Sequence, residues 1–247
     1  MGNLLNLFHV CLCHGFIVAS DGKWEEIKMG YFVVVRIWES IPPASRISRY
    51  VAPLSAALIS HRLGDVVGWS TRMSAELEIE SVEFDLDLVN LDEGVNIAKL
   101  LLEEAGAPAG SELRIEQRGE EKIIPFGKKE GLAIYLDGIN LPDSVYERCT
   151  CDSLAFQING ALTSVEGEIR GSWVGRNETA IYIYGPNAEI MFSAIEPFLT
   201  SYPLCQNSRI VIRHGNPELN SRTVRLPFHE GGEEVQQVFW GGQSGSG

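Results

Sequence analysis

Residues 31–38 (YFVVVRIW) form a short apolar stretch that predicts a β-strand, because β-branched and aromatic residues favour extended backbone. A similar stretch, residues 131–137 (GLAIYLD), begins about one hundred residues later, and prolines soon follow both. Self-similarity at a fixed spacing indicates an internal duplication. The two stretches therefore predict two copies of one folding unit, each opening with this strand.

The segments that follow the two opening strands also run in parallel. Each copy shows a helical pattern, two strand patterns, a second helical pattern and a last strand. Packed by the usual rules of connection, this order predicts an α+β protein: a tandem duplication of a ferredoxin-like β-α-β-β-α-β sandwich. Two helices should cover one face of each four-stranded antiparallel sheet and leave the other face open. The expected helices are 45–63, 90–106, 143–162 and 187–200, and the remaining strands are 66–71, 79–88, 112–117, 165–173, 179–184 and 208–213.

The ends of the two copies carry a shared apolar-Pro-Phe segment, at residues 123–126 and 225–228. A charged connector, residues 119–130, lies between the copies. We therefore expect a first unit over residues 29–127 and a second over residues 128–230.

Both chain ends are expected to lie outside these units. Residues 24–29 back-translate to a sequence that can contain a bacterial ribosome-binding site just before the codon for Met29. Residues 1–28 are therefore expected to be a mis-assigned or flexible extension, and residues 231–247, which end in GGQSGSG, a flexible tail. The apolar residues 4–19 are too short for a membrane span and lack the preceding basic residues of a secretion signal.

The composition limits the partners of the protein. The formal net charge is −13, which repels nucleic acid and anionic membranes and favours a basic protein partner. Five scattered cysteines, an odd number, predict no disulfide framework and indicate a reducing compartment, so we expect a cytoplasmic protein. The sequence does not indicate an oligomeric state.

Strand alternation separates the two faces of each predicted sheet. In residues 82–88 (VEFDLDL) the apolar side chains must point at the helices, which leaves Glu83, Asp85 and Asp87 on the open face. Glu112 and Glu116 should join them from the last strand of the first copy. The first open face is therefore expected to be acidic and to bind a partner.

The open face of the second copy has a different composition. Alternation places Tyr135, Tyr182 and Tyr184 on it, together with Arg209 and Arg213. Aromatic residues and arginine are typical of binding hot spots, so these five residues are also candidate partner-binding residues. Two alternatives remain: the face is covered within the chain, by the other copy or by a helix or tail, or it binds RNA. Its tyrosines resemble, in position only, the stacking platform of RNA-recognition motifs, but residues 181–184 (IYIY) do not match that family's consensus.

No motif for nucleophilic, nucleotide-dependent or metal-dependent chemistry is present in the sequence, and we expect no cofactor and no metal site. The leading hypothesis is a bacterial, non-catalytic binding protein, most specifically an immunity-type inhibitor that neutralises a basic toxin. One alternative is an enzyme with a cleft between the copies, whose candidate residues are His214, Arg213, Cys149 and Asp137. The other is a structural or assembly component that uses its sheet edges.

Overall fold

The computed structural model describes residues 16–18, 24–26, 30–117 and 119–227. Strands β1 (Phe16–Val18) and β2 (Trp24–Glu26) pair in antiparallel fashion. The rest of the stretch 1–28, expected to be an extension, lies outside the described residues. The expected tail, 231–247, lies outside them as well.

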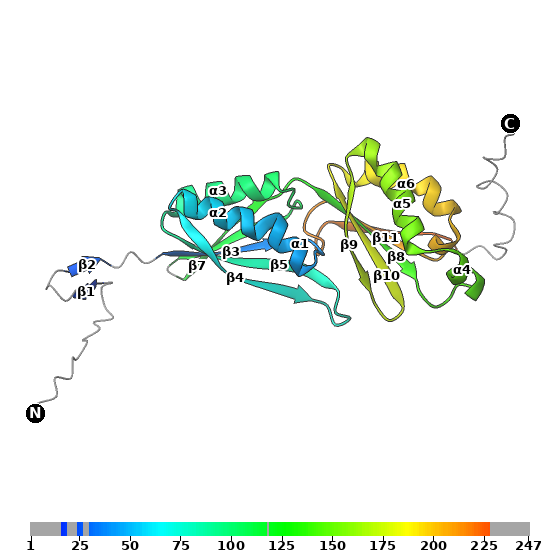
Figure 1. The fold of residues 1–247 in the computed structure, drawn as a ribbon, viewed down its shortest axis with the longest axis horizontal. Helices are drawn as coiled ribbons and strands as arrows, with labels where there is room; N and C mark the ends of the chain where they lie inside the picture. The colour runs from blue at the N-terminus through cyan, green and yellow to red at the C-terminus, as the bar shows by residue number, and fades with distance from the viewer. Residues whose placement is uncertain (1–15, 19–23, 27–29, 118, 228–247) are drawn as a thin grey trace, which may run out of the picture.

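The described chain is an α+β protein with two five-stranded antiparallel sheets, each covered by helices on one face (Figure 1). In the first unit the strands lie in the order β4-β5-β3-β6-β7, and in the second in the order β9-β10-β8-β11-β12. The strand order is therefore the same in both units. This confirms the predicted duplication of a ferredoxin-like fold. The strands are β3 (Tyr31–Ile37), β4 (Gly64–Met73), β5 (Ile79–Leu88), β6 (Ser111–Gln117), β7 (Glu120–Phe126), β8 (Glu130–Asp137), β9 (Glu168–Val174), β10 (Glu178–Gly185), β11 (Arg209–Arg213) and β12 (Ser221–Arg225).

The fifth strand of each sheet corrects the expected four-stranded sheets. The region expected to be a charged connector, 119–130, instead contains β7, which pairs with β6 from Ser111↔Phe126 to Gln117↔Glu120. In the second unit β12 pairs with β11 in the same way. The added strand satisfies backbone groups that the last ferredoxin-like strand would otherwise expose at a sheet edge.

The helices of the first unit contain a break that a proline explains. The expected single helix consists of α1 (Pro43–Arg46), a π-helical turn η1 (Ile47–Val51) and α2 (Ala52–Ser60). Pro53 lies in the first turn of α2, where its missing N–H costs least, and the widened turn precedes it. The second helix, α3 (Leu91–Glu104), begins at the N-cap Asn90, whose side chain accepts a hydrogen bond from the Glu93 N–H.

The first expected helix of the second unit is also divided. It consists of α4 (Asp143–Arg148) and α5 (Cys151–Leu162), and the Thr150 side chain caps the start of α5. Because the division falls at residues 149–150, Cys149 and Cys151 do not lie on one helix as expected. The remaining helical segments are η2 (Thr163–Val165), α6 (Ala188–Ser201), which begins at the N-cap Asn187, and η3 (Pro203–Cys205).

Each unit has its own hydrophobic core between its sheet and its helices. In the first unit Val35, Phe84 and Leu113 from three adjacent strands are fully buried. Their counterparts in the second unit are Ile134, Ile181 and Ile210. These equivalences follow from the register, because Val35 pairs with Phe84 and Leu113, while Ile134 pairs with Ile181 and Ile210.

A β-bulge recurs at the same place in both sheets. The register shifts between Val66 and Gly68 on β4, and between Ile169 and Gly171 opposite β10. The extra residue is Val67 in the first unit and Arg170 in the second. Bulges redirect a side chain, and Arg170 is used at the contact between the units.

Within the described residues, no helix is long and apolar enough to cross a membrane.

Candidate partner-binding surface

The open face of the first sheet carries the acidic residues that the strand pattern predicted. Val82, Phe84 and Leu86 are fully buried towards the helices, so Glu83, Asp85 and Asp87 project from the opposite face. Glu112 and Glu116 occupy the corresponding face of β6, where they alternate with the buried Leu113 and Ile115. The structure therefore brings the five acidic residues together on one sheet surface.

Arg36 neutralises two of these five residues. It lies on the central strand β3, opposite Glu83 on one side and Glu112 on the other. Its guanidinium group is 2.6 Å from the Glu83 carboxylate and 3.2 Å from that of Glu112. Cross-strand pairs of opposite charge stabilise a sheet, so Glu83 and Glu112 have a structural role.

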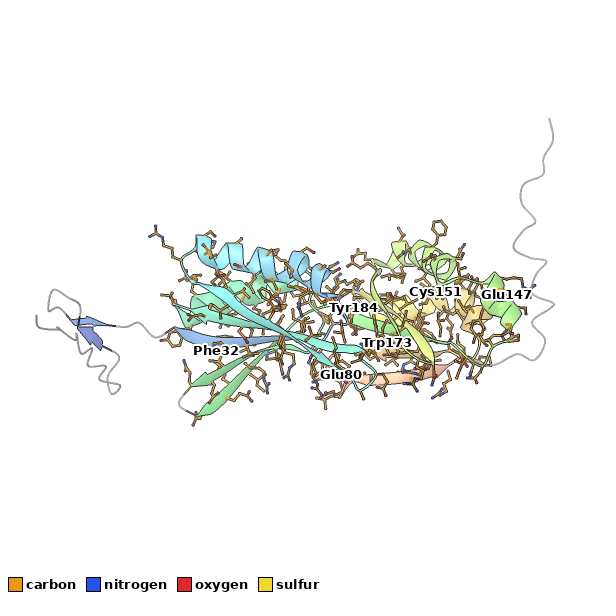
Figure 2. All side chains as sticks on the ribbon, turned by 60° about the horizontal axis from the view of Figure 1, so that its bottom comes forward. Phe32, Glu80, Glu147, Cys151, Trp173 and Tyr184 are labelled. Carbon is orange, nitrogen blue, oxygen red and sulfur yellow. The ribbon has the colours of Figure 1, made fainter. Side chains whose placement is uncertain are left out.

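Asp85, Asp87 and Glu116 form the remaining acidic group. Among the described residues, none of these three carboxylates makes an ion pair. Asp87 pairs in register with Phe32, a residue that is 55% exposed, and Asp85 pairs with Val34. The result is a surface on which carboxylates flank an exposed aromatic ring. Figure 2 shows Phe32 at the end of the first unit that is farther from the second unit.

The tyrosines of the second open face are not exposed. Tyr135, Tyr182 and Tyr184 keep only 4%, 1% and 2% of their surface accessible, and they form a cluster with Ala133 and Ala180. The expectation that they form an exposed face is therefore wrong, and the alternative of intramolecular packing describes their positions. In Figure 2, Tyr184 and Trp173 lie where the second sheet meets the first unit.

The covering groups come from two loops of the first unit. The Glu78 carboxylate, at the tip of the β4–β5 hairpin, accepts hydrogen bonds from the hydroxyls of Tyr135 (2.5 Å) and Tyr182 (2.8 Å). The Tyr184 hydroxyl accepts a hydrogen bond of 3.1 Å from the Ser40 N–H. Burial raises the pKa of Tyr135 to about 12; the charge of Arg213 opposes this shift and the hydrogen bond to Glu78 adds to it.

The two arginines predicted with these tyrosines serve the same contact. Arg213 donates a hydrogen bond of 3.2 Å to the Tyr135 hydroxyl. Arg209 stacks over the Tyr135 ring at 3.4 Å from its centre and forms a paired hydrogen bond with Glu178 (2.9 and 2.8 Å). The three tyrosines thus bond to groups of the first unit, and the two arginines contact Tyr135 from within the second unit.

An ion pair across the contact was not predicted from the sequence. Arg170 Nη1 lies 3.3 Å from the fully buried carboxylate of Glu39 and donates to the Gly106 carbonyl oxygen at 2.8 Å. Tyr50 donates its hydroxyl hydrogen bond to the same carboxylate. Burial raises the pKa of Glu39, against the opposing effects of the Arg170 charge and the Tyr50 hydrogen bond. No local pattern in the sequence distinguishes Glu39 or Arg170 from other charged residues.

The residues proposed for an alternative enzyme do not converge. His214 lies near the carboxylates of Glu130 and Glu189, at 3.3 and 3.2 Å. The Asp137 carboxylate accepts hydrogen bonds from the backbone N–H groups of Ile139 and Asn140; burial would raise its pKa, but these hydrogen bonds lower it. Cys149 packs beside the core of the second unit, and only Arg213 reaches the contact between units. The described residues contain no group of side chains suited to a metal ion.

No protein-family model and no curated protein matches the chain. Several solved structures resemble it weakly. One is a complex of TiaS with a transfer RNA, AMPCPP and agmatine, with 13% sequence identity and a TM-score of 0.27. That match covers 79% of this chain and 59% of the TiaS chain. The regulatory subunit of aspartate kinase from Thermus flavus has 14% identity and a TM-score of 0.23 over 68% of this chain and 92% of its own. The first two RRM domains of yeast poly(U)-binding protein have 10% identity and a TM-score of 0.21, and the match covers 78% of this chain and 98% of that chain. At these values the likeness concerns the class of fold and indicates no activity.

Proposed function

We propose that this protein is a non-catalytic binding protein that holds a basic protein on the open face of its first sheet. The supporting observation is the group formed by Asp85, Asp87 and Glu116 around the exposed ring of Phe32. Among the described residues these carboxylates make no ion pair, so their charge is available to a cationic partner. Tyr135, Tyr182, Tyr184, Arg209 and Arg213 are not part of this proposal, because they are engaged within the chain.

The two kinds of side chain have different roles in the proposed complex. Carboxylates on an acidic protein attract a basic partner from a distance and raise its rate of association. Phe32 and the partly buried Val34 provide the apolar contact that slows dissociation. The surface therefore fits a partner segment in which cationic and apolar side chains alternate, as on one β-strand or one helix face.

The more specific form of this proposal is an immunity-type inhibitor that neutralises a basic toxin. The overall charge of −13 supports it, because an acidic inhibitor captures a basic toxin rapidly. The test is whether the product of the neighbouring gene loses its toxicity when this protein is produced with it. If that product is harmless alone, or equally toxic with and without this protein, the inhibitor form is wrong while the binding surface stays testable by itself.

The binding surface can be tested with a short peptide of alternating lysine and leucine. We expect the peptide to shift the backbone NMR signals of β3 and β5 and to bind less tightly as salt increases. The triple variant Asp85→Asn, Asp87→Asn, Glu116→Gln should bind about tenfold more weakly, since each exposed charge contributes roughly 0.2–1 kcal/mol.

A matched control separates the position of the charges from their number. Glu104, Glu147 and Glu196 are exposed residues on helices, and changing all three to Gln alters the net charge by the same amount. This control should bind the peptide as the wild type does. Equal weakening in both variants, or signals that shift evenly over the whole surface, would show that only overall charge attracts the peptide.

A further inference from the structure

Arg36 shows how the first open face holds a guanidinium group. This residue lies on the central strand β3, and its guanidinium pairs with Glu83 on β5 at 2.6 Å and with Glu112 on β6 at 3.2 Å. The two carboxylates stand on the strands to either side of β3, so their backbones are about 10 Å apart, at about 4.8 Å for each strand spacing. One planar guanidinium group, which has donors on more than one edge, spans this gap.

Phe32 occupies the same kind of position on β3 without a cation. Its neighbour on β5 is Asp87, and its neighbour on β6 is Glu116, because Val33 pairs with Ile115 and the register continues by one residue. The aromatic residue and the two acidic residues are all exposed. Two carboxylates therefore flank an aromatic ring across the same two strand spacings, and within the described part of the chain no cation pairs with either of them.

The arginines of β3 and β6 are already engaged elsewhere on this face. Arg36 is held by Glu83 and Glu112, and Arg114 pairs with Glu112 at 3.6 Å and with Glu121 at 3.1 Å. The negative charge beside the aromatic ring is therefore not compensated by any described residue. A surface of this kind selects a cationic group.

The second open face shows how a guanidinium group uses an aromatic ring. Arg209 lies over the Tyr135 ring, at 3.4 Å from its centre, and forms two hydrogen bonds with the Glu178 carboxylate. A guanidinium group can stack flat on a ring while its edges meet carboxylates, whereas the ammonium group of lysine is a compact charge without a flat face. An aromatic ring between two carboxylates suits the guanidinium group better.

We infer that Phe32, Asp87 and Glu116 form a site for an arginine side chain of the basic partner. Its guanidinium group stacks on the ring and bridges the two carboxylates. This inference rests on the proposed function, because the arginine belongs to the partner held on the first open face. It names arginine, and not basic residues in general, as the side chain that this surface recognises. The partner thus supplies at Phe32 the group that Arg36 supplies within the chain.

Two peptides of equal length and charge test the inference on the full chain, one of alternating arginine and leucine and one of alternating lysine and leucine. We expect the arginine peptide to bind about tenfold more tightly, because only its guanidinium groups can both stack and bridge. In NMR spectra of the complex, the Cδ protons of a peptide arginine should show NOEs to the ring protons of Phe32. A peptide with citrulline, which is neutral and similar in shape to arginine, should bind more weakly than both.

Variants separate the role of the ring from that of the carboxylates. Phe32→Leu keeps an apolar side chain and removes the ring, so the preference for the arginine peptide should disappear. Asp87→Asn and Glu116→Gln should each reduce the preference, because the guanidinium group is left with one carboxylate. The matched control is Asp85→Asn on the same strand, which lies beside Val34 and not beside the ring. It should weaken both peptides by the same factor.

The outcomes separate the arginine site from the proposed function. Equal binding of the arginine and lysine peptides by the wild type would overturn the arginine site and leave the proposed function standing, since a basic peptide still binds. A preference for arginine that persists in Phe32→Leu would also overturn the site, because the ring would then play no part. If no peptide shifts the signals of β3 and β5, the proposed function is wrong and the arginine site with it.

Discussion

The open faces of the two sheets have equivalent positions and different chemistry. On the first face, Asp85 and Asp87 are exposed to solvent to differing degrees and flank an exposed phenylalanine. On the second, tyrosines fill the equivalent positions and are buried against the first unit. The register makes the following residues equivalent: Asp85 and Tyr182, Asp87 and Tyr184, Arg36 and Tyr135, Glu112 and Arg209, Glu116 and Arg213, and Phe32 and Gly131.

The comparison separates the positions that form the fold from those that give each unit its role. Residues on the helix-covered face stay apolar in both units, as with Phe84 and Ile181, because both cores need the same packing. Residues on the open face have no such constraint from the helices. Their composition follows from what covers them: solvent in the first unit, and the first unit itself in the second.

The largest effect should come from the bulge residue of the second unit. Arg170→Met leaves the buried Glu39 carboxylate without its cation, and we expect a loss of about 3–5 kcal/mol in the free energy of unfolding. Val67→Met, at the equivalent bulge position of the first unit, is the control and should be nearly neutral because Val67 is exposed. Urea denaturation measures both. Equal effects would contradict the difference between the two bulges.

The loss in Arg170→Met should also depend on pH. Burial raises the pKa of Glu39, so the folded state binds this proton more tightly than the unfolded state. The stability that this group contributes is therefore present below its ordinary pKa and is lost as the pH rises through its folded pKa. Without Arg170 that pKa rises further. The destabilisation measured at neutral pH should shrink at mildly acidic pH, and a loss independent of pH would contradict the role given to Glu39.

A somewhat smaller effect is expected at the hairpin tip of the first unit. Glu78→Ala removes the shared acceptor of the Tyr135 and Tyr182 hydroxyls, which should lower the free energy of unfolding by about 2–3 kcal/mol. Glu76→Ala, an exposed residue of the same hairpin, should change it little. If both variants unfold at the same urea concentration, the hydrogen bonds from the two tyrosine hydroxyls to Glu78 do not contribute to the free energy of unfolding.

Alkaline pH should lower the stability that the second open face contributes and should leave the first open face unaffected. The pKa of Tyr135 rises from 10.0 to about 12 through burial, so its contribution is complete below pH 10.0 and is lost as the pH rises towards 12. The loss should reach about 3 kcal/mol, because each of the two pKa units is worth roughly 1.36 kcal/mol. The free energy of unfolding measured against pH, with Tyr135→Phe for comparison, checks this. A wild-type profile that matches the variant would contradict it.

The smallest effect concerns the position that is Gly131 in one unit and Phe32 in the other. A Cβ atom at residue 131 would lie 3.2 Å from Tyr184 Cε1, so Gly131→Ala should cost about 1 kcal/mol as the ring shifts. Phe32→Ala removes an exposed ring and should change stability by less than about 0.5 kcal/mol, while it weakens binding of the lysine–leucine peptide. Thermal unfolding and peptide titration separate the two outcomes.

Much of the fold could be predicted from local patterns. Alternation on β5 placed Glu83, Asp85 and Asp87 on the open face, and Asn90 marked the start of α3. One sign of duplication was less accurate. The Pro-Phe pairs, at residues 125–126 and 227–228, are offset by two positions, because Phe126 pairs with Ser111 while the Leu226 N–H bonds to the equivalent Ser208.

The fifth strands and the contact between the units could not be predicted in the same way. Residues 119–130 are rich in charge and have weak strand character, and only pairing with β6 makes β7 extended. The tyrosines of residues 181–184 have the composition of an exposed binding site as well as that of a buried contact. The choice depends on Ser40 and Glu78, which are distant in sequence and meet these residues only in the folded chain.

The sequence by itself determined the two ferredoxin-like units and the acidic character of the first open face. Strand alternation and helix caps are local, and a core of apolar side chains has few ways to pack. Only the tertiary structure decided which open face is covered and which is exposed. That outcome depends on whether complementary groups from the other unit reach each face, and such a contact joins Ser40 to Tyr184, which lies 144 positions later in the chain.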